Sequence, residues 1–201
     1  MSQQAAEHAN IATDYFALFE RPRHLVLDTS QLEKDFYRLS RQWHPDRFAS
    51  AGAEEKQRSL EMTSLINDAY RALKDPIART EYLLAIEGKP IERDKNVGAK
   101  EIPADLLEEV FELNMQIEEM RSGADDPQVR VDLETAQTNF ERQLKDAAIQ
   151  LNELWRAWDK AENSADAGEK LKTLDAMVAL LHRRQYIANL VRDVRAALGV
   201  E

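Results

Sequence analysis

The sequence contains no cysteine, which excludes disulfide bonds, thiol catalysis and every zinc site that needs a thiolate ligand. Glycine and proline are also scarce, with six of each among 201 residues. These two residues supply most of the turns that sheets require, whereas the abundant Ala, Leu, Glu, Arg, Lys and Gln lose little side-chain entropy in helices. The composition therefore predicts a nearly all-α fold.

Three further absences bear on location and partners. No apolar run approaches the roughly 20 residues that a membrane-spanning helix needs. The first dozen residues contain one charged side chain, Glu7, and neither Arg nor Lys, so they match neither a secretory nor a mitochondrial targeting segment. No long basic run offsets the formal net charge of -10, which repels phosphate backbones. These features predict a cytoplasmic protein that binds neither membranes nor nucleic acid.

Helical periodicity is present along the first 88 residues. A short apolar helix is expected after the cap candidates Thr13-Asp14, and Pro22 ends it. A second helix should begin near Asp28 and a third should end at Asp75-Pro76, because proline disfavours helix at the residue before it. A short fourth helix should follow over 77–86. Apolar stripes predict that the second and third helices pack as an antiparallel hairpin, through Leu32, Phe36, Leu39 and Trp43 on one and Met62, Leu65, Ile66, Ala69 and Leu73 on the other.

The remaining residues carry three longer helical patterns, over about 103–121, 127–163 and 168–198. A three-helix bundle is the simplest packing for them. Residues between Gly88 and this region lack periodicity. We therefore expect four parts: a flexible N-terminus (1–12), a helical-hairpin domain (13–88), a linker (89–100) and a bundle (101–201).

The tripeptide His44-Pro45-Asp46 interrupts the second helical pattern. Proline lacks an amide hydrogen and pushes the preceding residue out of the α region, so these side chains should project from a loop. Before the loop, Lys34, Arg38 and Arg41 recur at spacings of four and three and should line one exposed face. Alone, such a pattern also fits a helix-ending turn beside a solvated helix face.

The surrounding residues favour a functional interpretation. The tripeptide is followed by Arg47-Phe48-Ala49 and by a helix containing Ile66-Asn67-Asp68-Ala69-Tyr70, and the whole arrangement resembles a J-domain. Two flanking segments, Asp14–Phe19 and Arg79–Leu84, are similar to those of the HscB family of J-domain co-chaperones in bacterial iron–sulfur cluster assembly. That family joins a J-domain to a three-helix domain, and the resemblance spans about residues 13–198.

The resemblance implies a co-chaperone that has no catalytic residues, cofactor or metal. Its J-domain would stimulate the ATPase of an HscA- or DnaK-type chaperone, and its bundle would bind an IscU-type scaffold protein. The chaperone-binding residues would be His44, Pro45, Asp46, Lys34, Arg38, Arg41 and Arg47, and the scaffold-binding residues Leu107, Phe111, Glu112, Glu119 and Tyr186. The sequence departs from the family pattern at Glu108, where an apolar residue is common, and at Met115, where a carboxylate is common.

Three alternatives stay open at this point. Leu107 and Phe111 also fit simple core packing. The bundle could carry a different client, because a fold does not fix a function. A metal-dependent hydrolase using His44 and Asp46 is a third possibility, although the sequence has four histidines and no H-E-x-x-H spacing.

Overall fold

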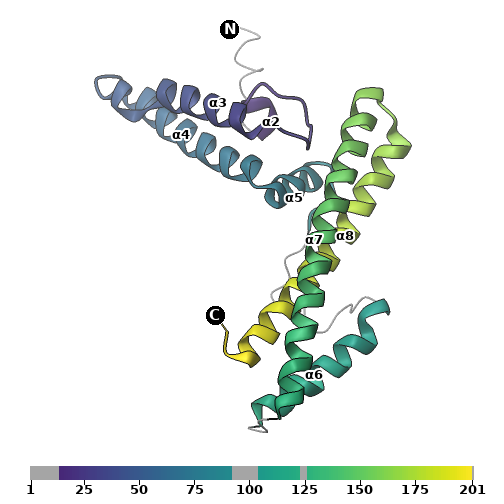
Figure 1. Cartoon of the computed structure of the whole chain (residues 1–201). Coiled ribbons are helices and arrows are strands. Elements are labelled where there is room, and N and C mark those ends of the chain that lie inside the picture. The colour runs from purple at the N-terminus through teal and green to yellow at the C-terminus, as the bar shows by residue number, and fades with distance from the viewer. Residues whose placement is uncertain (1–13, 92–103, 123–125, 201) are drawn as a thin grey trace. The chain divides into compact units, whose positions relative to one another are not determined.

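The computed structural model describes residues 14–91, 104–122 and 126–200, and every regular element within them is a helix (Figure 1). This confirms the predicted all-α fold class. The flexible N-terminus expected over 1–12 and most of the linker expected over 89–100 lie outside the described residues. The elements are α2 (Tyr15–Leu18), α3 (Thr29–Trp43), η1 (Pro45–Phe48), α4 (Ala53–Lys74), α5 (Pro76–Ile86), η2 (Ala104–Leu106), α6 (Leu107–Arg121), α7 (Pro127–Ser164) and α8 (Ala167–Leu198).

Local capping explains where the N-terminal helices begin and end. The Asp28 carboxylate accepts hydrogen bonds from the backbone amides of the first turn of α3, at 2.9 and 3.0 Å. α3 ends at Trp43 because His44, which precedes a proline, adopts φ -59° and ψ 129°. Asp75 ends α4 and then caps α5, accepting a 2.7 Å hydrogen bond from the amide of Ala78.

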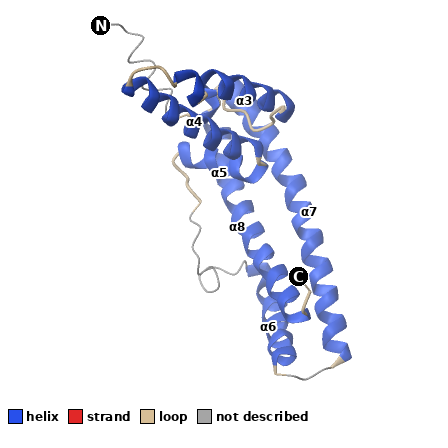
Figure 2. Ribbon diagram, turned by 90° about the vertical axis from the view of Figure 1, so that its left-hand side faces the viewer, coloured by secondary structure: helices blue, strands red, loops and turns tan. Residues whose placement is uncertain are grey.

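α3 and α4 lie side by side as the predicted hairpin (Figures 1 and 2). Leu32 and Leu39 of α3 and Ile66 and Leu73 of α4 are buried. Full burial of such a side chain stabilises the fold by about 1.5–3 kcal/mol. The other two residues of the α3 stripe, Phe36 and Trp43, are only partly buried and pack by ring stacking. The Phe36 ring centroid lies 4.1 Å from that of Tyr70, and the Trp43 ring centroid lies 6.0 Å from that of Phe48.

The chain divides into two compact units, and the first of them includes residues far along the sequence. Met1–Pro90 and Trp155–Lys172 form this unit, so the ends of α7 and α8 next to their connecting turn pack with the hairpin. Trp158 is fully buried and its Nε1 donates to the backbone carbonyl of Arg23 at 2.7 Å. Nε1 of Trp155 donates to the Thr80 hydroxyl at 2.9 Å.

A carboxylate makes a second set of contacts in the first unit. Asp159 accepts hydrogen bonds from the backbone amides of Leu25 at 2.7 Å and Val26 at 3.0 Å. Burial raises the pKa of this carboxyl, while the two amides act in the opposite direction. The division of the chain seen in its packing therefore differs from the predicted domains 13–88 and 101–201. Trp155, Trp158 and Asp159 lie on α7 but form hydrogen bonds with the hairpin domain. The functional domain assignment itself stays a prediction.

The second unit, Ile91–Leu154 with Thr173–Glu201, contains α6 and the remaining parts of α7 and α8. It is the predicted three-helix bundle. α6 buries one face at helical spacing, and Leu133 and Phe140 of α7 are fully buried. The core cluster consists of Leu106, Val110, Leu113, Ile117, Val129, Leu133, Phe140, Tyr186, Ile187, Leu190, Val191, Val194 and Leu198. Among the helices that the structure describes, none combines the length and apolar character needed to cross a bilayer.

Candidate functional site

His44, Pro45 and Asp46 lie at the junction between α3 and the single 3₁₀ turn η1. The sequence predicted a loop here, and the structure corrects this: only His44 has extended backbone, while Pro45 begins η1 because its fixed φ suits the first position of a helix. The side chains project as predicted, with exposed fractions of 56% for His44 and 91% for Asp46. Both are therefore available to a partner.

The His44 side chain caps η1 itself. Its Nδ1 accepts a hydrogen bond from the backbone amide of Asp46 at 3.3 Å and lies 3.5 Å from the Asp46 carboxylate. In a neutral imidazole whose Nδ1 accepts, the proton is on Nε2. This assignment leaves Nε2 as a donor toward a partner.

The predicted cations are all exposed, but they differ in their intramolecular partners. Arg38 forms an ion pair with Asp35 at 3.6 Å, and Asp35 also accepts a 2.7 Å hydrogen bond from Arg21. Although partial burial raises the pKa of Asp35, the hydrogen bond and charge of Arg21 lower it below its usual range. Arg38 is thus partly neutralised, whereas no ion pair involves Lys34 within the described residues.

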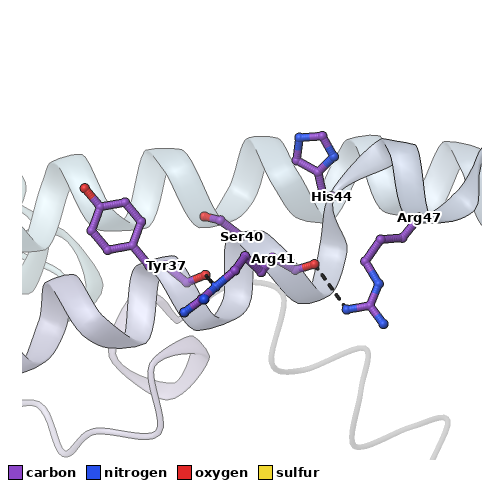
Figure 3. A pocket seen from close by; sticks show the side chains of 5 residues that line it. All are labelled: Tyr37, Ser40, Arg41, His44 and Arg47. Carbon is purple, nitrogen blue, oxygen red and sulfur yellow. Dashed lines mark hydrogen bonds between the residues drawn. The ribbon is translucent and has the colours of Figure 1, made fainter.

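An open pocket adjoins the His44 side chain (Figure 3). Arg41 and Arg47 line it, and an amino group of Arg47 donates to the carbonyl of Arg41 at 3.3 Å, which links η1 to the last turn of α3. The structure therefore brings His44, Arg41 and Arg47 together, while Lys34 and Arg38 do not line the pocket.

Sequence reasoning missed two residues of this pocket, Tyr37 and Ser40. Tyr37 is 54% exposed, which is unusual for an aromatic side chain. The positions 37, 40, 41 and 44 follow the spacing of one helix face. The sequence signal for both residues is therefore this spacing, which places them on the same face of α3 as Arg41 and His44.

A second candidate surface lies on α6. Leu107, Phe111 and Met115 are 56%, 66% and 60% exposed and recur every four residues, so they form one apolar ridge. The alternative that Leu107 and Phe111 serve only core packing is therefore wrong. The core-facing side of α6 is instead made by Val110, Leu113 and Ile117, and Leu106 at the end of η2 is buried beside them.

Carboxylates flank the ridge. Glu112 and Glu119, both predicted, are exposed, as are Glu108 and Glu118. Met115 departs from the family pattern, but its position completes the ridge. The α6 surface thus combines three exposed apolar side chains with an acidic rim, which is the composition of a modest protein interface.

Tyr186 does not lie on the α6 surface. It is 8% exposed and belongs to the bundle core with Ile187 and Leu190 of the same helix. This burial raises the pKa of its phenol. The family resemblance grouped Tyr186 with the apolar patch of α6, whereas the structure buries it in the bundle core, and a resemblance between sequences does not show which side of α8 faces the core. Its role in scaffold binding stays a prediction.

No group of three or more His, Cys, Asp or Glu side chains converges as metal ligands would, within the residues that the structure describes.

Comparisons with known proteins agree with this geometry. The family model described as DnaJ domain matches residues 4–82. The structure is similar to that of chaperone HscB from Vibrio cholerae, with a TM-score of 0.58 and 26% identity, over 91% of this chain and 96% of that one. It also has the fold of human co-chaperone protein HscB, with a TM-score of 0.59 and 22% identity, over 91% of this chain and 81% of that one.

Proposed function

Since the chain is a J-domain co-chaperone of the HscB type, we propose that it serves iron–sulfur cluster assembly, by delivering an IscU-type scaffold to an HscA-type chaperone and stimulating its ATPase. The observation that supports this proposal best is the projection of His44 and Asp46 from the end of a basic helix, where Asp46 is 91% exposed. The protein acts as an adaptor and catalyses no reaction itself. A cytoplasmic location belongs to the same proposal.

On the chaperone side, α3 and η1 bias a conformational equilibrium of the partner. Lys34, Arg38 and Arg41 attract an acidic surface and speed the encounter. Asp46 then pairs with a partner cation, and Nε2 of His44 donates a hydrogen bond. A ligand shifts an equilibrium only as far as it binds one state more tightly than the other. The contacts of Asp46 and His44 should therefore be stronger in the ATP-hydrolysing state of the chaperone than in its other state.

On the scaffold side, the ridge of Leu107, Phe111 and Met115 fits an apolar patch, and its acidic rim fits lysines or arginines around that patch. This chemistry also allows a different client on the bundle, which is the second candidate function. The presence of Met115 where a carboxylate is common favours it, since this change makes the surface more apolar.

The proposal is tested by steady-state ATP hydrolysis of an HscA-type chaperone, measured with the protein alone and with an IscU-type scaffold. Stimulation that the scaffold strengthens would support both halves of the proposal. Stimulation that the scaffold leaves unchanged would point to a different client on the bundle. No stimulation at all would contradict the choice of chaperone.

Phe111→Ala is expected to weaken scaffold binding by about 1–3 kcal/mol, the usual loss for an aromatic interface anchor. Its 66% exposure means that the melting temperature should not change. Isothermal titration calorimetry measures the affinity. Ile149→Ala, which removes an apolar side chain that is 62% exposed on α7, is the matched control and should bind normally. Equal losses in both variants would argue against a specific site on α6.

Tyr37→Ala is expected to raise the protein concentration needed for half-maximal ATPase stimulation about fivefold, or roughly 1 kcal/mol, as for a contributing interface aromatic. Leu60→Ala on α4 is the control, since Leu60 is 53% exposed and does not line the pocket. A concentration dependence identical to that of the wild type would remove Tyr37 from the chaperone-binding surface.

A further inference from the structure

The carbonyl of Trp43 is the last of α3 and lies directly before His44. Carbonyls in the last turn of a helix have no partner within the helix and must find one elsewhere. The Trp43 carbonyl accepts two hydrogen bonds from α4, from the hydroxyl of Ser59 at 2.8 Å and from that of Thr63 at 3.0 Å. Both of its lone pairs are therefore used.

These two hydroxyls depart from what hydroxyls within helices usually do. Ser and Thr inside a helix commonly donate to the carbonyl four residues earlier in the same helix. Thr80, Thr135, Thr138 and Ser164 all do so. Ser59 and Thr63 lie one turn apart on α4 and donate instead to a neighbouring helix. Ser59 is fully buried, so bulk water does not compete for its hydrogen bond.

The other end of the turn is tied to the same tryptophan. The ring of Phe48, the last residue of η1, stacks on the Trp43 ring at 6.0 Å with an interplanar angle of 10°. The guanidinium of Arg58, again from α4, lies 5.9 Å from the Trp43 ring. His44 and Asp46 thus project from a short segment whose two ends are both held through Trp43.

We propose that Ser59 and Thr63 are positioning residues, which hold the backbone at the end of α3 so that His44 and Asp46 face the chaperone in their binding geometry. This inference rests on the co-chaperone activity proposed above. When the competent conformation is only a fraction of the population, the apparent dissociation constant rises by the inverse of that fraction. Loss of the hydroxyls should therefore weaken binding without lowering the stimulation reached at saturation.

The test compares the double variant S59A/T63V with the wild type in the chaperone ATPase assay. Valine has nearly the shape of threonine but no hydroxyl. We expect the half-maximal concentration to rise about fivefold to tenfold while maximal stimulation stays within twofold of the wild type, as a population shift requires. The single variant Thr63→Ser keeps a hydroxyl at position 63 as well as Ser59. Its half-maximal concentration should therefore equal that of the wild type.

Thr135→Val is the matched control, since it removes a hydroxyl that donates to the Val131 carbonyl on α7. The folded fraction of each variant is measured by circular dichroism at the assay temperature. The inference would be overturned if the unfolded fraction accounted for the rise in half-maximal concentration, or if Thr135→Val showed the same rise. An unchanged half-maximal concentration in the double variant would also overturn it.

A second measurement separates this inference from the proposed function, because it needs no partner. Within the turn, the N–H of Arg47 donates to the His44 carbonyl and the N–H of Ala49 donates to the Asp46 carbonyl. We expect both amides to exchange hydrogen faster in S59A/T63V than in the wild type or in Thr135→Val. If the wild type fails to stimulate the chaperone, the proposed function fails and exchange still decides the positioning role. Equal exchange rates in all three proteins would overturn it.

Discussion

Asp46→Asn should abolish stimulation of the chaperone ATPase while the protein stays folded. The Asp46 side chain is 91% exposed, and its carboxylate lies 3.5 Å from Nδ1 of His44, which is exposed as well, so the fold does not depend on the charge of Asp46. The amide of Asn keeps the shape but cannot pair with a partner cation. Loss of one partner from a desolvated charge pair typically costs 2–5 kcal/mol. A loss of about 2 kcal/mol, the lower end of that range, already corresponds to a roughly 25-fold weaker interaction at 1.4 kcal/mol per factor of ten.

Steady-state ATP hydrolysis over a range of co-chaperone concentrations measures this effect. Asp68→Asn is a suitable control, because Asp68 is an exposed carboxylate on α4 that pairs with Arg71 at 2.7 Å and is not part of the turn. It should stimulate normally. Full stimulation by Asp46→Asn would mean that the exposed carboxylate is a solvated surface group and that the chaperone recognises another part of α3.

Trp158→Ala is expected to destabilise the first unit by about 3–5 kcal/mol, the usual cost of removing a large aromatic side chain from a core. Trp158 is fully buried, and its indole donates a 2.7 Å hydrogen bond to the Arg23 carbonyl. The substitution therefore leaves a cavity and an unpaired carbonyl. Urea unfolding followed by circular dichroism measures the free energy of unfolding.

Two companion variants sharpen this measurement. Trp158→Phe keeps most of the apolar volume but loses the indole donor, so it should cost less than Trp158→Ala. Ile149→Ala removes an exposed side chain from the same helix and should leave stability within about 0.5 kcal/mol of the wild type. A Trp158→Ala protein as stable as Ile149→Ala would mean that Trp155–Lys172 does not belong to the N-terminal unit in solution.

The helices could be predicted from the sequence because their ends depend on local chemistry. Asp28 and Asp75 cap the helices that follow them, and Pro45 ends α3 at Trp43. Each of these signals acts within a few residues, so no knowledge of the tertiary structure was needed. The same local rules predicted that His44 and Asp46 would project, although they could not show that a 3₁₀ turn supports them.

The parts that could not be predicted depend on which faces pack together. Apolar periodicity marks one side of a helix but does not identify its neighbour, so Trp155 and Trp158 gave no sign that they bond to the hairpin domain. Tyr186 was grouped with the scaffold-binding residues through the family resemblance, which does not show that this side chain is buried in the bundle core. Conversely, the family resemblance indicated Leu107 and Phe111, and only the structure showed that Met115 extends their ridge.

The contact between Asp159 and the chain before α3 has an implication for sequence variation. The carboxylate binds the N–H groups of Leu25 and Val26, which every amino acid except proline supplies. Val26 is also 53% exposed, so its side chain is not fixed by packing. Any of the nineteen residue types other than proline at position 26 therefore preserves the hydrogen bond to Asp159. Position 159, in contrast, needs a side chain of aspartate's length that carries a hydrogen-bond acceptor.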